Sequence, residues 1–217
     1  PEDGAANGVR TVSVEEKLGL HASPTCVLSF EGARGWLVGE AQGGMAAMFT
    51  MMNNARLGVG IQGVGIAEKA LQKAAGYARD RVQGRTADAS PTIVGHADVR
   101  RMLMTMQAET QGARALAYDC AVSIDLAEAD PESREAHAAR AAALTPIAKA
   151  WCTETGIAVA DLGIQVHGGV GYVEETGAAQ PWRDARVTAI YEGTNGIQAM
   201  DLVGRKLSMD GGVAVSA

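Results

Sequence analysis

Apolar and small residues repeat every three or four positions from Gly43 to about Gly84. This spacing places their side chains on one face of a helix, because an α-helix turns once every 3.6 residues. The pattern therefore predicts one long helix, whose apolar face has to be buried against other helices. The stripe consists of Met45, Met48, Met52, Arg56, Val59, Gly63, Ile66, Ala70, Ala74 and Tyr77.

The rest of the chain predicts more helices of the same kind. Similar spacing favours helices at about 97–128 and 133–162, and a last helix at about 195–208. Short helical pieces joined by glycines are expected between the last two. Antiparallel helices connected in this way close into an up-and-down four-helix bundle, so the predicted fold class is mainly α.

The first forty residues have a different pattern. GVRTVSVEE at 8–16 and TCVLSFEG at 25–32 are rich in β-branched and apolar residues and predict two strands. Two strands are not stable alone. We therefore expect 1–40 to be the end of a β-domain whose earlier strands are missing, 41–210 to be the helical bundle and 211–217 to be a loose tail.

Composition excludes some classes of protein. The 217 residues carry a formal net charge of −6 without a basic region, which argues against nucleic acid as the main partner. No apolar run approaches the ~18 residues of a membrane span. The chain also shows no signal segment.

Cysteines and histidines do not indicate a metal site or disulfides. The four histidines lack metal-ligand spacing, so no metal is expected. The three cysteines are far apart and in apolar surroundings, which favours reduced, buried thiols in a cytoplasmic protein. They are Cys26, Cys120 and Cys152.

Glu192 lies between Tyr191 and Gly193 at the start of the last predicted helix, in AIYEGTNGIQ. A carboxylate in the first turn of a helix interacts favourably with the helix dipole, which would be a purely structural role. The same carboxylate could act as a base. The residues around Glu192 leave both interpretations open.

Three other stretches have a structural interpretation, and the first two also have a functional one. In QVHGGVGY, glycines directly after a helix form either a helix end or a place where a ligand approaches the backbone. Arg56 lies in an apolar, glycine-dotted helix, where it is either a surface arginine or a buried one that needs an anion. Cations in YARDRVQGR complement the negative end of a helix.

Together these stretches resemble the C-terminal half of acyl-CoA dehydrogenases, flavoproteins that introduce an α,β double bond into acyl-CoA thioesters. The matching motifs are YEGTNGIQ, QVHGGVGY, PWRDARV and the helix that begins NNARLGVGIQG. Nearly the whole chain is covered, including the strand pair, which resembles the end of the family's middle β-domain. MFTMMNNAR and RVQGR are most similar to the larger branch that includes 3-(methylthio)propanoyl-CoA dehydrogenases.

The resemblance implies roles at the substrate. Glu192 would be the catalytic base that removes the proton next to the thioester carbonyl, and Gly193 would leave room for the substrate. Arg56 and Asn53 match an Asp-x-x-Arg pair that contacts the CoA moiety in the family, with an amide here in place of the acid.

The resemblance also implies an FAD cofactor. Arg81 is similar to the arginine that holds the FAD diphosphate, with Gln83 beside it, although the family's Phe-Gly is absent. One stretch would reach the FAD of a neighbouring subunit, and the turn after Gly193 would touch the flavin of its own subunit. These residues are Gln165, Val166, His167, Gly168 and Gly169 for the first, and Thr194, Asn195 and Gly196 for the second.

The implied partners are an acyl-CoA substrate, an electron-transfer flavoprotein and further copies of the chain, as a homodimer or homotetramer. The family's N-terminal helical domain and most of its β-domain are missing from the 217 residues, so we expect this fragment to hold FAD weakly and to be inactive alone. An acyl-CoA oxidase that uses oxygen and a non-catalytic helical oligomerisation module are the alternatives.

Overall fold

A computed structural model describes residues 4 and 6–212. Two compact units are present, one within residues 1–51 and the other within residues 52–217. The division expected at residue 40 stays a prediction. Most of the tail expected at 211–217 lies outside the described residues, while Gly211 and Gly212 end a short 3₁₀-helix, Met209–Gly212.

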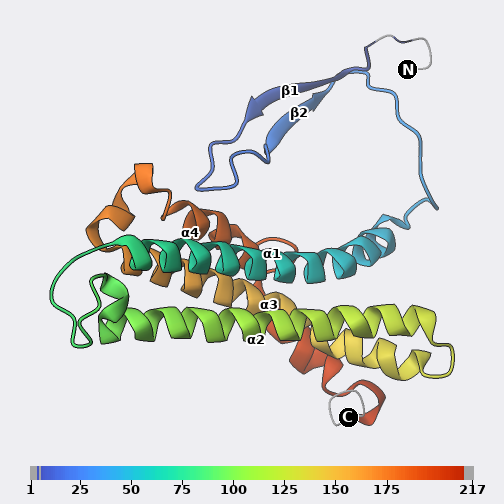
Figure 1. Ribbon diagram of the computed structural model, residues 1–217. Coiled ribbons are helices and arrows are strands. Elements are labelled where there is room, and N and C mark those ends of the chain that lie inside the picture. Colours follow the sequence, from blue (N-terminus) through green and yellow to red (C-terminus); the bar gives the residue numbers. More distant parts are fainter. Residues whose placement is uncertain (1–3, 5, 213–217) are drawn as a thin grey trace. The chain divides into compact units, whose positions relative to one another are not determined.

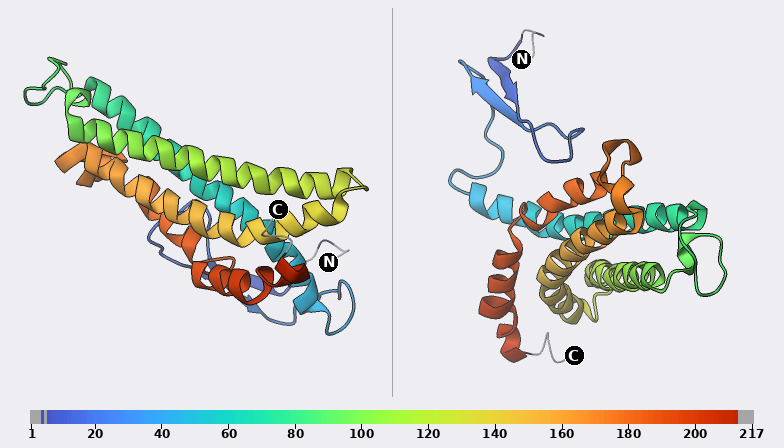
Figure 2. Two further views of the ribbon diagram at one scale, coloured as in Figure 1. Left: turned by 90° about the horizontal axis from the view of Figure 1, so that it is seen from below. Right: turned by 90° about the vertical axis from the view of Figure 1, so that its left-hand side faces the viewer.

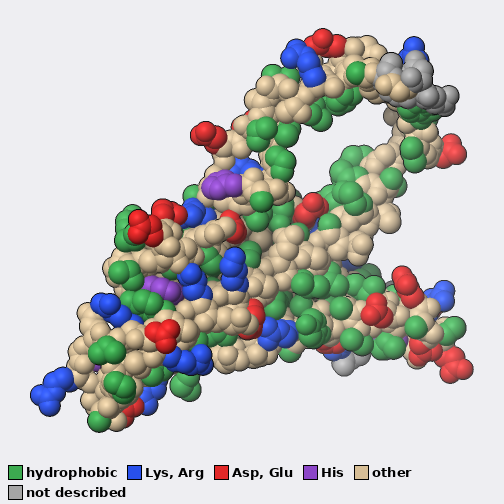
Figure 3. Space-filling view, turned by 45° about the horizontal axis from the view of Figure 1, so that its top comes forward, with side chains coloured by type: hydrophobic (Ala, Val, Ile, Leu, Met, Phe, Trp, Pro, Cys, Tyr) green, Lys and Arg blue, Asp and Glu red, His purple; other side chains and the backbone are tan. Residues whose placement is uncertain are grey.

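The first unit contains a β-hairpin. Strand β1, Val9–Val14, pairs antiparallel with β2, Cys26–Phe30, and a bulge falls between Thr11 and Ser13. Both predicted strands are confirmed. Hydrophobic side chains lie exposed along the hairpin (Figure 3), because it has no second layer to cover it. The prediction that Cys26 is buried is wrong for the same reason, since β2 is open to solvent.

Three long helices dominate the second unit as far as the structure describes it. They are α1, Gly44–Asp80, whose first eight residues belong to the first unit, α2, Ala97–Ala129, and α3, Arg134–His167. The helices run side by side in alternating directions (Figures 1 and 2). This arrangement confirms the mainly α bundle, and α3 continues five residues beyond its predicted end at Leu162.

The fourth layer of the bundle is made of shorter pieces. After α3 the chain forms 3₁₀ turns, the helix α4, Gln180–Ala185, and then α5, Asn195–Asp201. The predicted last helix continues beyond α5 as a π-helix, Leu202–Lys206, in which the Leu207 N–H donates to the Leu202 carbonyl at 2.9 Å. Such π segments are frequent at functional sites.

Small residues let α1 and α3 cross closely. A Cβ atom at Gly63 would lie 2.3 Å from the Cys152 carbonyl oxygen, and one at Gly156 would lie 2.8 Å from the Gly63 carbonyl oxygen. The backbones therefore touch, which explains how a chain with 4% aromatic residues fills its core. Met102 and Met106 point into this core, whereas Met104 is exposed. In the described part of the chain, no helix combines the length and the apolar character that crossing a membrane requires.

Candidate functional site

Glu192 lies in the turn between α4 and α5, and its backbone is left-handed. Its φ is +53° and that of Gly193 is +82°. Left-handed backbone is uncommon for a residue with a side chain, costs of order 1–3 kcal/mol and is concentrated at functional sites. The helix-dipole interpretation of Glu192 is wrong, because α5 begins at Asn195 and has no acidic residue in its first turn. Glu192 is half-buried, and contacts of the residues on either side of it hold the turn in place.

Contacts on both sides of Glu192 fix this turn. The Tyr191 hydroxyl donates a hydrogen bond to the Gln62 side chain of α1. Gln198 Nε2 of α5 donates to the Gly193 carbonyl at 3.0 Å. Glycine at 193 suits its φ and also leaves room for Gln198 Nε2, which would lie 2.8 Å from a Cβ there. Two helices therefore fix the turn on both sides of Glu192.

Tyr191 is sensitive to the charge of Glu192. Burial raises the pKa of the Tyr191 hydroxyl, the hydrogen bond to Gln62 lowers it, and the neighbouring Glu192 carboxylate raises it. At neutral pH the hydroxyl is therefore protonated and serves as a donor.

A buried ion pair between α1 and α5 lies next to the Glu192 turn. Arg56 of α1 is 5% exposed and donates through Nη1 to Asp201 Oδ2 at 3.1 Å and to Asn53 Oδ1 at 3.3 Å. Arg205 Nε contacts the other oxygen of Asp201 at 2.8 Å. The expectation that a buried Arg56 needs an anion is confirmed. The anion is Asp201, so this ion pair connects α5 to α1.

A buried lysine completes this polar layer. Lys149 of α3 is fully buried, and its Nζ donates to Asn195 Oδ1 at 3.1 Å. Burial and then the Arg56 guanidinium lower the pKa of Lys149 to about 8, while the Glu192 carboxylate acts in the opposite direction. Two buried cations and the half-buried Glu192 thus lie close enough to influence each other.

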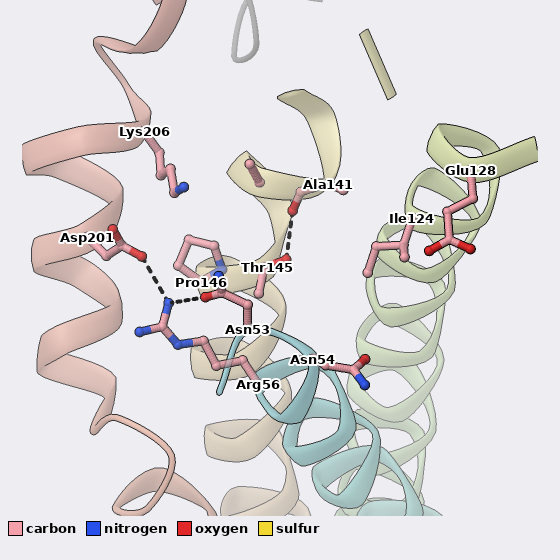
Figure 4. Close-up of a pocket in the computed structure, with 11 residues that line it drawn as sticks. Asn53, Asn54, Arg56, Ile124, Glu128, Ala141, Thr145, Pro146, Asp201 and Lys206 are labelled. Carbon is pink, nitrogen blue, oxygen red and sulfur yellow. Dashed lines mark hydrogen bonds and ion pairs between the residues drawn. The ribbon is translucent and has the colours of Figure 1, made fainter. Parts of the chain in front are cut away.

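Arg56 also lines a cavity of about 420 Å³ (Figure 4). Asn53 and Arg56, the residues expected to bind substrate, line it together with Asp201 and Lys206. Glu128 of α2 lies across the cavity. Arg56 Nε and Gln198 Oε1 are buried and lack a hydrogen-bond partner among residues 4 and 6–212. Unpaired buried polar atoms are costly, so they mark a place where water or a ligand is expected.

Most of the expected cofactor residues lie at the far end of the bundle, where α1 and α3 both finish (Figure 1). Tyr77 near the end of α1 stacks on His167 at the end of α3, with ring centroids 4.5 Å apart. Arg81 follows Tyr77 by one turn, is exposed and contacts Gln83 Oε1 at 3.2 Å. The structure therefore brings Arg81, Gln83 and His167 to one end of the unit.

The glycine turn after α3 is both a helix end and an open backbone. Gly168 caps α3 with φ 63° and ψ −144°, a conformation that is essentially restricted to glycine. A Cβ at Gly168 or Gly169 would meet no atom within 4 Å, so this backbone is open to a ligand. Gln165 is also exposed. Val166 and His167 are buried, which limits their side chains to the core.

The second set of expected cofactor residues, Thr194 to Gly196, lies elsewhere. The side chain of Asn195 binds to α3. Its amide donates to the Ala150 carbonyl, Thr153 Oγ1 and Glu154 Oε1 at 3.2–3.3 Å. Thr194 and Gly196 are exposed. From Ala150 to His167, α3 rises by about 25 Å at 1.5 Å per residue. The two sets are therefore well separated along the bundle.

Comparison with known proteins decides the family. Residues 42–207 match the family model described as the acyl-CoA dehydrogenase C-terminal domain. The chain belongs to the acyl-CoA dehydrogenase family. It is 52% identical over 216 residues to 3-methylmercaptopropionyl-CoA dehydrogenase of Ruegeria pomeroyi, a match that covers 97% of this chain and 37% of that protein.

Solved structures of related proteins have the same fold. The chain superposes on Caenorhabditis elegans ACDH-11 in complex with C11-CoA with a TM-score of 0.86 and 28% identity, covering 98% of this chain and 35% of that one. A structure titled as the electron transferring flavoprotein of Acidaminococcus fermentans matches with a TM-score of 0.79 and 29% identity, over 94% and 50% of the two chains. The chain thus covers between about a third and a half of the length of these relatives.

Sequence reasoning found the turn of this acyl-CoA dehydrogenase chain but missed the residues that hold it. The sequence did not predict a role for Lys149, Gln198 or Asp201. In the structure each of them is buried and at most 4% exposed. One signal was present in the sequence, because Lys149 interrupts the otherwise apolar and small run PIAKAWC. A lysine in the middle of a buried stripe indicates a polar partner.

Proposed function

We propose that the full-length protein is an FAD-dependent acyl-CoA dehydrogenase in which Glu192 is the base. One observation carries the proposal: Glu192 has a left-handed backbone in a turn fixed by hydrogen bonds from α1 and α5. A bundle needs no such conformation for packing, and strain of this kind is retained where function requires it. Family membership supplies the reaction class.

Different residues of this chain would act on different parts of the substrate. Glu192 takes the proton from the carbon next to the thioester carbonyl, and Gly193 leaves the approach free of a side chain. Arg56 and Asn53 bind the CoA portion. FAD, when bound, would supply the acceptor for the hydride from the β-carbon, and an electron-transfer flavoprotein would take the electrons.

Two separate groups of residues would hold FAD. Arg81, Gln83 and the stretch from Gln165 to Gly169 form one, and its open glycine backbone fits a phosphate-bearing ligand. Thr194, Asn195 and Gly196 form the other. Because α3 separates the groups by about 25 Å, we assign them to different flavins in a homodimer or homotetramer. The fragment alone is then inactive, since neither flavin site is complete.

The test uses the full-length, flavin-loaded protein without oxygen. Addition of 3-methylmercaptopropionyl-CoA, the thioester named for the Ruegeria pomeroyi relative, should bleach the flavin absorbance. Glu192→Gln keeps the size of the side chain but removes the base, and should slow bleaching by about 10²–10⁴-fold. Glu175→Gln makes the same change at an exposed position of the same unit and should bleach normally.

Three results would contradict the proposal. Undiminished bleaching in Glu192→Gln would remove Glu192 from the role of base. Failure of the wild-type protein to bleach with any acyl-CoA in a chain-length series would remove the dehydrogenase activity. Stoichiometric peroxide in air would assign the protein to the acyl-CoA oxidases instead.

A further inference from the structure

Lys149 occupies a position where an apolar residue would be expected. It lies on the inner face of α3 between the buried residues Pro146 and Cys152, and its side chain is 0% exposed. Leucine or methionine could fill such a position without desolvating a charge, which is expensive for an unpaired ammonium group. A lysine there requires an interaction that an apolar side chain cannot make.

The hydrogen bond of Lys149 leads to the Glu192 turn. Its Nζ donates to Asn195 Oδ1, and the amide of Asn195 donates back to α3 at the Ala150 carbonyl, Thr153 and Glu154. Asn195 is the first residue of α5 and lies three positions after Glu192. Lys149 therefore anchors the end of the turn that carries Glu192.

The charges around Lys149 leave Glu192 as its counter-ion. From α1 it faces Arg56, whose like charge repels it, and from the turn it faces Glu192, whose opposite charge attracts it. Asp201 of α5 is already bound by Arg56 and Arg205. Glu154 of α3 is exposed and accepts from Asn195. The attraction between Lys149 and Glu192 is thus the electrostatic gain that offsets part of the cost of burial.

We propose that Lys149 is a positioning residue for the base: it fixes the Glu192 turn through Asn195, and its positive charge attracts the Glu192 carboxylate. The carboxylate is thereby held where it can accept the substrate proton. The proposal rests on the proposed function, since it assigns Lys149 a role through Glu192. Lys149 keeps its own proton at neutral pH, because its pKa is about 8.

The first experiment measures the rate of flavin reduction by 3-methylmercaptopropionyl-CoA in the full-length protein. Lys149→Met removes the charge and the hydrogen bond, and Lys149→Gln removes the charge but keeps a donor for Asn195. Lys149→Met should lower the limiting rate of flavin reduction by about tenfold with KM changed less than about twofold, because a misplaced base slows proton transfer more than it weakens substrate binding. Lys149→Gln should recover part of this rate.

Lys69→Met is the matched control, since it makes the same change at an exposed position of α1. Its rate of flavin reduction should equal that of the wild type. A purely structural lysine would lower protein yield or flavin content without changing the rate per bound flavin. Folded, flavin-loaded Lys149→Met protein with the wild-type rate would overturn the proposal.

The second experiment needs neither substitution of Lys149. Coupling between two charges is reciprocal, so replacing Glu192 must change the titration of Lys149. In ¹³C-lysine-labelled full-length protein, the lysine that titrates near pH 8 should titrate at lower pH in Glu192→Gln. An unchanged midpoint would refute the coupling. Because this titration does not depend on turnover, its failure is distinct from loss of the proposed activity.

Discussion

Gln198 Nε2 donates to the carbonyl of Gly193 at 3.0 Å, and the position of a Gly193 Cβ lies 2.8 Å from the same nitrogen. A side chain at 193 would therefore displace the donor of the hydrogen bond that fixes the Glu192 turn, and the φ of +82° favours glycine independently. Gln198 is 1% exposed, so its side chain is packed on all sides. The geometry of the base thus depends on a residue without a side chain.

Replacing Gly193 by alanine should destabilise the protein and misplace Glu192. An L-residue at φ +82° costs about 1–2 kcal/mol, and the displaced hydrogen bond of Gln198 adds about 1 kcal/mol. We expect a loss of about 2–3 kcal/mol in urea denaturation and slower flavin bleaching. Gly58→Ala, where a Cβ meets no atom within 4 Å, is the control and should retain the wild-type rate. Equal effects of the two substitutions would contradict this account.

The bundle and the turn could be predicted because local patterns determine them. Periodicity located α1 and α2 within a few residues, whereas α3 continues five residues beyond its predicted end. The partners of Arg56 and Lys149 could not be predicted in this way. Asp201 lies 145 positions after Arg56, and Asn195 lies 46 positions after Lys149. Pairing over such distances depends on how α5 packs, which no local pattern specifies.

The pair of Arg56 and Asp201 should be far more important for stability than the pair of Arg205 and Asp201. Asp201→Asn leaves the buried Arg56 charge without an anion and should cost about 3–5 kcal/mol of unfolding free energy. Arg205 is 71% exposed, so Arg205→Gln should cost at most about 1 kcal/mol. Urea denaturation of the two variants checks the contrast, and similar losses would show that Arg56 finds another partner.

The crossing of α1 and α3 should not tolerate a methyl group at Gly63. A Cβ there would lie 2.3 Å from the Cys152 carbonyl oxygen, which belongs to backbone and cannot rotate away. Gly63→Ala should therefore cost about 3 kcal/mol or more, since overpacking forces the helices apart. Gly65→Ala, two residues along α1 and open to solvent, should be neutral or stabilising by up to about 1 kcal/mol. A stable Gly63→Ala protein would disprove the close crossing.

Lys149 should give the protein an unusual gain in stability at alkaline pH. Its pKa is about 8 in the folded chain against 10.5 as a free side chain, so both states bind its proton below pH 8 and the cost of burying the charge is fully present. Between pH 8 and 10.5 the unfolded state binds more protons, and the free energy of unfolding rises with pH, by about 3 kcal/mol over the window.

The comparison with Lys149→Met isolates this effect. Cys152, whose pKa burial raises to about 12, loses stability above pH 9 in both proteins and cancels in the difference. Lys149→Met should therefore be the more stable protein at pH 7, because it buries no charge, and this advantage should shrink as the pH rises to 10.5. Urea denaturation at several pH values measures it, and a constant difference would show that Lys149 titrates like an exposed lysine. A lysine that lowers stability at neutral pH is retained for another reason, and its attraction to Glu192 provides one.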